Sequence, residues 1–516
     1  MALNPAGWLR ENARTYFGNA AAVRDYRAQL RGNRALWLWG GYLGLLVLIT
    51  SVIYSSTVRG NVQDIALVQF QLREFYGSII TMLAVFVTLV TPAMTASAIT
   101  IERQRKSLDL VFTAPVSPKY LLIGKMLSSY RYTWMLLVLA LPITAVSVVM
   151  GGATWMDVLA AFIMLSAHAL IFTSIGILLS TLSPNTVAAV VYTYLVVGLY
   201  SGVMSGIAAA YSISSFSGMG TGEVSWAATL TPFSVGFVAP TFTTLWGIAV
   251  PNWVFTVLFA LTISKVLLVA SASALTHFLS ADTKSLRVHA LVYAFLASTL
   301  MVGGTSGVTR AAAGSMTGRD ADFARAFPVV MLSLILLFFV PHLTCYSSGE
   351  GVKFRPTGAF SFKEAIRGRT SGAGPFLLLF AALAFGGGAL GSYFGANVVP
   401  GFFYWGAMIY ILGMFTFWWA AGRLISSFGP TLKTARLLLV AVMVFLLGAP
   451  VPLLSIYEAA TMNYGGPSDA WRVLMLYPLG GPGAMETAAV YGTIFLVLGV
   501  LLAAYAESNL RNRISR

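Results

Sequence analysis

Residues 101–125 read IERQRKSLDLVFTAPVSPKYLLIGK, a charged and proline-broken stretch set between two long apolar runs. Its first part has a helical pattern, because Leu108 and Phe112 fall on one face while the basic residues lie elsewhere. Pro115 and Pro118 end that helix, since proline lacks an amide donor and disfavours helix in the residue before it. The pattern predicts a short amphipathic helix across the mouth of a membrane domain, followed by a second short helix at residues 119–125.

Composition defines the class of protein. The chain has 516 residues, of which 58% are hydrophobic and only 9% are charged, whereas a soluble globular chain carries about 25% charged residues. Many apolar stretches are about 20 residues long, the length that crosses a hydrocarbon core of about 30 Å. We therefore expect an all-α polytopic membrane protein. The single cysteine, Cys345, allows neither an intrachain disulfide nor a thiolate metal cluster.

Twelve apolar segments are predicted to span the membrane as helices. The first six are 35–56, 78–100, 127–150, 156–182, 187–211 and 252–275. The next six are 289–308, 328–346, 375–397, 401–422, 435–457 and 486–506. Of the 32 Lys and Arg residues, 24 lie in the termini and the loops on their side, while 6 lie in the opposite loops. The positive-inside rule therefore places both termini in the cytoplasm. The net charge of +15 is explained by these loops without a nucleic-acid partner.

Three parts are expected along the chain. Residues 1–34 predict a basic, amphipathic helix on the inner membrane face. Residues 35–283 form a first six-span half, and residues 284–516 form a second, diverged six-span half. In each half a long basic inside loop follows the second span and a long outside loop precedes the sixth span, so the halves are predicted to be parallel repeats. The alternative is that loops of mixed length coincide by chance.

A resemblance to a known family rests on the opening stretch. It resembles the cytoplasmic loop of ABC-2-type permeases, the membrane subunits of one class of ATP-binding-cassette transporters, which reads roughly E-R-x-x-G-T-L-E-x-L, then T-P-V-S, then L-x-G-K. Lys106 departs from the family, which usually has glycine there, and residues 24–46 look like the family's basic lead-in to its first span. The matching positions are Glu102, Arg103, Ser107, Leu108, Asp109, Leu110, Pro115, Val116, Ser117, Gly124 and Lys125.

The resemblance implies a fused twelve-span permease that is a non-catalytic membrane subunit and exports a substrate across the cytoplasmic (plasma) membrane. Two ABC-type ATPase subunits would dock on residues 101–125 and hydrolyse ATP with Mg²⁺, so this chain would need no cofactor. Glu102 and Arg103 would fix the loop helix at the membrane edge, by ion pairing or by contact with the ATPase. Leu108, Leu110 and Phe112 would fill an apolar cleft on that partner.

Motifs for independent chemistry are missing from the sequence. No G-x-x-x-x-G-K-[ST] occurs, so a P-loop is not expected, and neither H-E-x-x-H nor G-x-S-x-G is present. Two rival functions remain open: an ion-coupled twelve-span carrier, which the lack of Asp and Glu at span centres weakens, and a membrane enzyme acting on lipid or glycan. Lys265, within the sixth span, either faces a transport pathway or extends its stem to a wetter region. The substrate, and whether a second permease chain is needed, are left undecided.

The outside loop at residues 212–251 contains apolar stretches too short to cross a bilayer, notably 233–250. One interpretation is a helix lying on the membrane surface. The family resemblance implies instead short helices that dip into the outer leaflet before the sixth span and form an outer gate.

Overall fold

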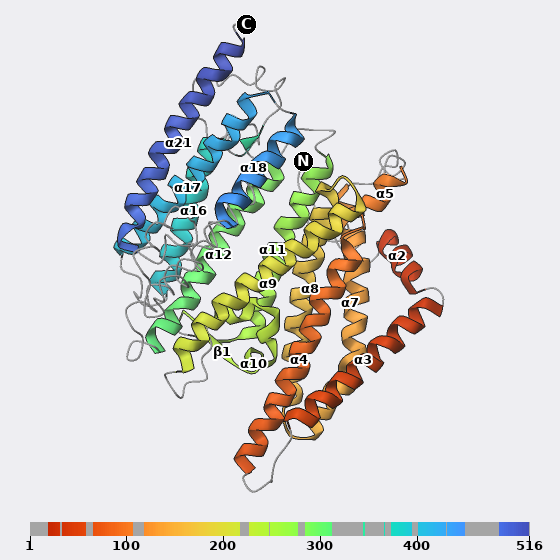
Figure 1. Ribbon diagram of the computed structural model, residues 1–516. Coiled ribbons are helices and arrows are strands. Elements are labelled where there is room, and N and C mark those ends of the chain that lie inside the picture. Colours follow the sequence, from red (N-terminus) through yellow and green to blue (C-terminus); the bar gives the residue numbers. More distant parts are fainter. Residues whose placement is uncertain are drawn as a thin grey trace, which may run out of the picture. The chain divides into compact units, whose positions relative to one another are not determined.

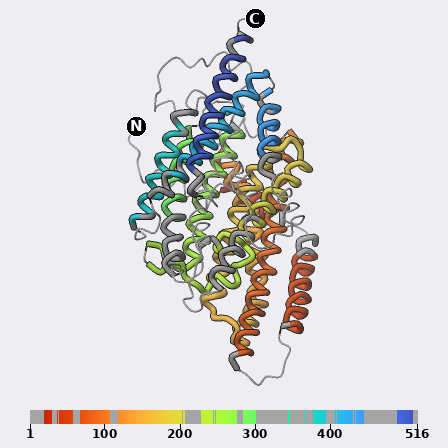
Figure 2. The backbone as a smooth tube through the Cα atoms, turned by 60° about the vertical axis from the view of Figure 1, so that its left-hand side comes forward, coloured from red at the N-terminus to blue at the C-terminus, as the bar shows by residue number. Residues whose placement is uncertain are grey.

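The computed structural model describes most of the chain and divides it into two compact units. Unit 1 comprises Met1–Thr243 with Ala249–Ser280, and unit 2 comprises Thr244–Ile248 with Ala281–Arg516. The described residues are 19–30, 33–57, 65–106, 118–216, 226–246, 248–276, 284–311, 344–345, 366, 373–394, 401–429, 431–448 and 485–514. Figure 2 traces the helices from a second direction, with unit 1 in red to yellow-green and unit 2 in green to blue.

Unit 1 is a bundle of long helices with short elements at both of its ends (Figure 1). Its long helices are α3 (Asn33–Thr57), α4 (Ile65–Thr95), α7 (Pro118–Val149), α8 (Trp155–Leu182), α9 (Thr186–Phe216) and α11 (Asn252–Thr276). Its short elements are α2 (Ala20–Leu30), α5 (Thr100–Gln104), the 3₁₀ helices η1 (Trp226–Leu230) and η2 (Pro232–Ser234), and α10 (Val235–Val238). The strands β1 (Phe242–Leu245) and β2 (Ile248–Pro251) lie at the division between the units, because Thr244–Ile248 is assigned to unit 2.

Helix α8 is the core of unit 1, packed against α4, α7, α9 and α11. It begins with a capping box, in which Thr154 Oγ1 accepts from the amide of Asp157 and the Asp157 carboxylate accepts from the amide of Thr154. Its centre carries His168, which is fully buried and whose Nδ1 lies 2.9 Å from the carbonyl oxygen of Met164. Helix α8 therefore supplies a fixed frame for the shorter elements at both of its ends.

Several predicted spans in unit 1 are longer in the structure. Helix α4 begins at Ile65 rather than at residue 78, because the residues before the predicted span continue the same helix. The separate short helix predicted at 119–125 is wrong: these residues are the first turns of α7, which starts with Pro118. Proline is favoured at the first helical position, where its missing amide would have no partner, and Leu121 and Leu122 bury this end of the helix.

Unit 2 contains five described helices: α12 (Lys284–Ala311), α16 (Ala373–Phe394), α17 (Gly401–Ser427), α18 (Leu432–Gly448) and α21 (Met485–Ile514). Glycines allow them to pack closely. A Cβ on Gly387 of α16 would lie 2.8 Å from Thr299 Oγ1 of α12, and one on Gly499 of α21 would lie 2.8 Å from the backbone nitrogen of Phe417 in α17. The predicted span 328–346 lies outside the described residues except for Thr344 and Cys345.

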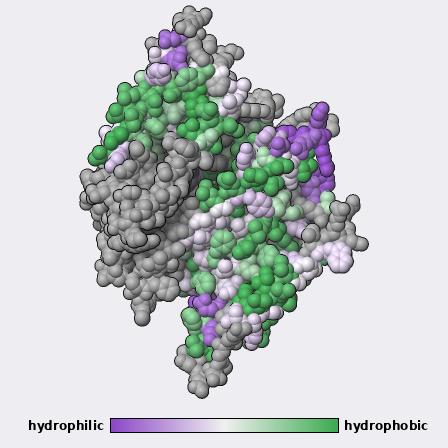
Figure 3. Space-filling model, viewed as in Figure 1, coloured by the Kyte–Doolittle hydropathy of each residue, from purple (hydrophilic) through white to green (hydrophobic). Residues whose placement is uncertain are grey.

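The described helices fit a membrane environment. Seven of them are long and apolar enough to cross a bilayer. Large apolar side chains such as Leu48, Leu195 and Leu501 lie exposed on helix surfaces, as expected for lipid-facing positions. Figure 3 shows hydrophobic side chains over much of the described surface, while hydrophilic ones gather over α2 and α5. The protein is an all-α polytopic membrane protein, as predicted.

The elements η1, η2 and α10 are packed into the bundle, so the surface-helix interpretation of residues 233–250 is wrong for its first part, whereas Phe242 of β1 and Ile248 of β2 are exposed. Leu230 and Val235 are buried, and η1, η2 and α10 contact α4, α8, α9 and α11. Thr81 Oγ1 of α4 donates to the carbonyl of Phe233 at 3.1 Å, and Tyr200 Oη of α9 donates to the carbonyl of Leu230 at 2.9 Å. Long helices therefore hold this segment through its backbone.

Candidate functional site

The start of the loop is a short helix, α5, held against the end of α8. After α4 the chain turns through residues 96–99 and forms α5. The amides of Ile99 and Thr100 both donate to Ser180 Oγ of α8, at 3.0 and 3.2 Å. Helix N-termini leave amides without intrahelical acceptors, and here a side chain of a different helix accepts from them. All three residues are buried, so the hydroxyl fixes where α5 begins.

Arg103 joins α5 to the last turn of α8. Its Nη1 donates to the carbonyl of Ser183 and its Nη2 to the carbonyl of Thr181, each at 2.8 Å. The final carbonyls of a helix lack amide partners and carry the negative end of the helix dipole, so a guanidinium is stabilised there. The next residue, Gln104, accepts a hydrogen bond of 2.9 Å from Thr186 Oγ1 at the start of α9. Helix α5 is thus attached to both helices of the α8–α9 turn.

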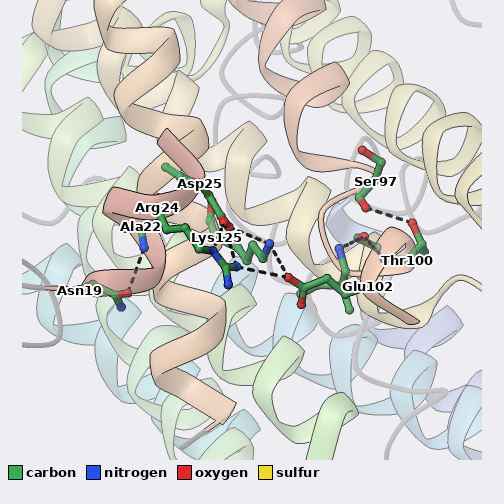
Figure 4. A network of polar contacts seen from close by, with 11 residues as sticks. Asn19, Ala22, Arg24, Asp25, Ser97, Thr100, Glu102 and Lys125 are labelled. Atoms are coloured by element: carbon green, nitrogen blue, oxygen red, sulfur yellow. Dashed lines mark hydrogen bonds and ion pairs between the residues drawn. The ribbon is translucent and has the colours of Figure 1, made fainter. Parts of the chain in front are cut away.

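A cluster of four charged residues, Arg24, Asp25, Glu102 and Lys125, joins three helices (Figure 4). Lys125 Nζ of α7 lies 2.6 Å from Glu102 Oε1 of α5 and 2.7 Å from Asp25 Oδ2 of α2. Arg24 Nη2 lies 2.9 Å from Asp25 Oδ1 and 3.9 Å from Glu102 Oε1. The side chains of Lys125, Glu102 and Asp25 are only 12, 15 and 16% exposed, so their charges depend on one another for compensation.

Helix α2 is placed on α7 by Asn19 and Tyr120. Asn19 Oδ1 accepts from the amide of Ala22 at 3.1 Å and caps α2, as asparagine commonly does at a helix start. Its Nδ2 donates to the carbonyl of Tyr120 at 2.9 Å, and the amide of Ala20 donates to Tyr120 Oη at 2.9 Å. Two hydrogen bonds, both donated by the N-terminus of α2 and both accepted by Tyr120, therefore join α2 to the first turn of α7.

Gly124 makes this contact possible. A Cβ at this position would lie 2.7 Å from Asn19 Oδ1 and 3.1 Å from Ala21 Cβ. Any side chain there would push α2 away from α7. The adjacent positions Gly124 and Lys125, which the sequence assigned together to the coupling loop, thus both face α2 in the structure.

Of the predicted site residues, the structure describes Glu102, Arg103, Gly124 and Lys125 and brings them to the α5 end of unit 1. The others in the loop lie outside the described residues: Ser107, Leu108, Asp109, Leu110, Phe112 and Pro115. Lys265 lies on α11 with an exposed side chain, apart from this site, and its pathway role stays a prediction. Within the described part of the chain, no group of three or more His, Cys, Asp or Glu residues could hold a metal ion.

Sequence reasoning missed the partners of the predicted residues. Asp25 and Ser180 were not identified, although each provides the contact that holds α5 or α7 in place. One signal was available for Asp25, because it is the sole acidic residue in the basic stretch 12–63. Ser180 has no such signal, since a serine near a helix end is common and its partners lie about 80 residues away in sequence.

Part of the chain matches a known family. Residues 45–272 match a family model described as ABC-2 family transporter protein, a range that runs from α3 into α11 and includes α5 and Lys125. Comparison with curated proteins gives no match. Over residues 45–272, therefore, the chain is similar to the ABC-2 family of transporter proteins, which supports a permease of an ABC transporter.

Proposed function

We propose that this permease exports a substrate across the cytoplasmic membrane and is driven by separate ATPase subunits that dock on residues 101–125. The partner subunits would bind and hydrolyse MgATP, and this chain would be non-catalytic. One observation carries the proposal: α5, at the start of the loop, is attached by side chains to α8, α9, α7 and α2. A force on the loop would therefore reach the long helices through named contacts.

The mechanism follows from the stiffness of these contacts. ATP binding would close a pair of ATPase subunits, and the apolar side chains Leu108, Leu110 and Phe112 would transfer that movement to α5. Because Arg103 and Ser180 bind α5 to the end of α8, α5 and α8 would move as one body. Loss of either contact would leave ATPase binding intact but weaken its effect on the helices.

The buried segment η1–α10 is the proposed outer gate. Its backbone is held by Thr81 of α4, Tyr200 of α9 and Thr256 of α11. A shift of α8, together with α4, α9 and α11, at the α5 end would therefore change the hydrogen bonds that hold this segment at the opposite end of these helices.

The proposal is tested with full-length chain purified from native membranes and reconstituted in nanodiscs. Leu108→Glu combined with Phe112→Glu should reduce the co-purified P-loop ATPase at least tenfold and abolish MgATP hydrolysis. Arg73→Glu is the matched control, because it changes the net charge by the same amount at an exposed position of α4 outside residues 101–125. Undiminished ATPase binding and hydrolysis in the double variant would overturn the docking assignment.

A further inference from the structure

The two units share a short sequence. Residues 176–184 at the end of α8 read GILLSTLSP, and residues 422–430 at the end of α17 read GRLISSFGP. Gly, Leu, Ser and Pro are identical at four of the positions, and three others are chemically similar. The family match covers the first copy only, since it stops at residue 272. The second copy, at residues 422–430, therefore bears on unit 2, which lies outside the family match.

In both copies the glycine packs closely against a buried threonine from an earlier segment of the chain. A Cβ on Gly176 would lie 2.7 Å from the Cβ of Thr95, and one on Gly422 would lie 2.8 Å from the Cβ of Thr344. Both threonines are buried, and each stands three residues after a proline in the sequence. In both units, then, a side chain in place of the glycine would separate the same pair of predicted spans, the second and the fourth of a half.

The side-chain hydrogen bonds in the last turn of α8 and in the last turn of α17 also match. Thr181 Oγ1 donates to the carbonyl of Leu178 at 2.6 Å, and Ser427 Oγ donates to the carbonyl of Leu424 at 2.7 Å. Each helix then ends just before its proline, and the next helix begins two residues after that proline, at Thr186 for α9 and at Leu432 for α18.

The caps of the following helices correspond as well. Asn185 accepts from the amide of Ala188 through its side chain and from the amide of Ala189 through its carbonyl, at 2.8 and 3.1 Å. Thr431 makes the same two contacts, at 3.3 Å to the amide of Thr434 and 2.9 Å to that of Ala435. Ala189 and Ala435 are both fully buried. Asparagine and threonine are both good caps, so the substitution preserves the geometry.

A generic proline turn between two helices would not reproduce all of this. Such a turn needs neither a glycine eight residues before the proline nor a threonine from a remote segment that packs against that glycine. Here the threonine precedes the glycine by 81 residues in unit 1 and by 78 in unit 2. The fourth predicted span of each half also packs against the sixth: α8 packs on α11 in unit 1, and α17 packs on α21 in unit 2. The agreement therefore extends over three segments of each unit.

We infer that unit 2 is a second permease half, and that one copy of this chain supplies both halves of the transporter and binds two ATPase subunits. The inference rests on the proposed function for its partner. It predicts a complex with one permease chain and two ATPases, whereas a half-sized permease would pair with a second copy of itself.

Native mass spectrometry of the wild-type complex from native membranes separates the outcomes without any variant. One permease chain with two ATPase chains supports the inference. Two permease chains with two ATPase chains overturns it while leaving the proposed function intact. A permease that drives transport without any ATPase overturns the proposed function instead. Co-expression of two differently tagged copies is an independent check, because the tags should not co-purify.

Matched variants test the second copy directly. Gly422→Val should reduce ATPase stimulation by the permease at least tenfold, as should Gly176→Val in unit 1. Gly386→Val and Gly198→Val are the controls, since a Cβ at either position meets nothing within 4 Å. Gly422→Ala serves where the valine variant does not fold, with a smaller loss expected. Full stimulation by a folded Gly422→Val protein would contradict a working second half.

Discussion

Lys125 Nζ lies 2.6 Å from Glu102 Oε1, and this contact joins the first turns of α7 to α5. The same nitrogen lies 2.7 Å from Asp25 Oδ2 of α2. One ammonium therefore neutralises two largely buried carboxylates, which come from two different helices that precede α7 in the sequence. Its loss would leave both acids in a site that excludes most water.

Lys125→Met is expected to release α2. The free energy that holds α2 should fall by about 2 to 3 kcal/mol, somewhat less than the about 3 to 5 kcal/mol for removing one partner of a fully buried ion pair, because each side chain keeps some exposure. Amide hydrogen exchange in α2 should then accelerate about 30- to 150-fold. Arg24→Gln is the control: Arg24 is 68% exposed, so a change below threefold is expected. Equal exchange in Lys125→Met and wild type would show that the cluster does not hold α2.

Arg103→Lys should uncouple ATP hydrolysis from transport without loss of ATPase binding. A guanidinium reaches two carbonyls at once through separate nitrogens, which a single ammonium does not reproduce. We expect at least a fivefold drop in permease-stimulated ATPase activity at unchanged co-purification. Arg73→Lys, the same change at an exposed position of α4 outside residues 101–125, should behave like wild type. If Arg103→Lys instead lost the ATPase altogether, Arg103 would contact the partner rather than α8.

The sequence indicated the loop but not how it is anchored. The Glu-Arg pair and the Gly-Lys pair could be located because the family pattern places them on either side of the proline-rich turn. Their partners could not, because Ser180 and Asp25 come close only when α8 and α2 pack in three dimensions. The boundaries of α4 and α7 were misjudged for a related reason: hydropathy marks the apolar part of a helix, whereas Pro118 and the polar residues before the spans belong to the same helices.

Ser180→Ala removes the hydroxyl that accepts hydrogen bonds from two buried amides, those of Ile99 and Thr100. Leaving buried donors unsatisfied costs about 1 to 3 kcal/mol each, so the turn at residues 96–104 should exchange amide hydrogens at least tenfold faster. Ser271→Ala is the matched control, because Ser271 is equally buried and donates only to the carbonyl of Leu267 in its own helix. Comparable exchange in both variants would argue against Ser180 as the anchor of α5.

Asn252→Ala should loosen the proposed outer gate. The buried Asn252 side chain donates to the carbonyl of Val238 at 3.2 Å and to Thr241 Oγ1 at 2.7 Å, and its oxygen accepts from Thr243. Loss of these bonds should cost about 2 to 3 kcal/mol and raise hydrogen exchange in residues 232–243. Thr262→Val, in the middle of α11, removes a bond within that helix and should leave this segment unchanged. Unchanged amide protection of residues 232–243 in Asn252→Ala would show that other residues hold this segment in place.

The short elements before α11 show the limit of composition as evidence. Residues 233–250 are apolar whether they lie on a membrane or inside a bundle, so hydropathy alone could not distinguish the two. What distinguishes them is a set of polar side chains on the long helices, Thr81, Tyr200 and Asn252, which donate to backbone carbonyls within residues 230–238. Such pairings are visible only once the helices are assembled.

Photocrosslinking from the loop tests the central claim most directly. Leu108 is replaced by p-benzoylphenylalanine in the full chain, and the complex with its ATPase is irradiated in native membranes. The account predicts a crosslink from residue 108 to the ATPase, with none from the same amino acid at Val149, an exposed position at the far end of α7. A crosslink at Val149 with none at residue 108 would place the ATPase on the opposite face and contradict the account.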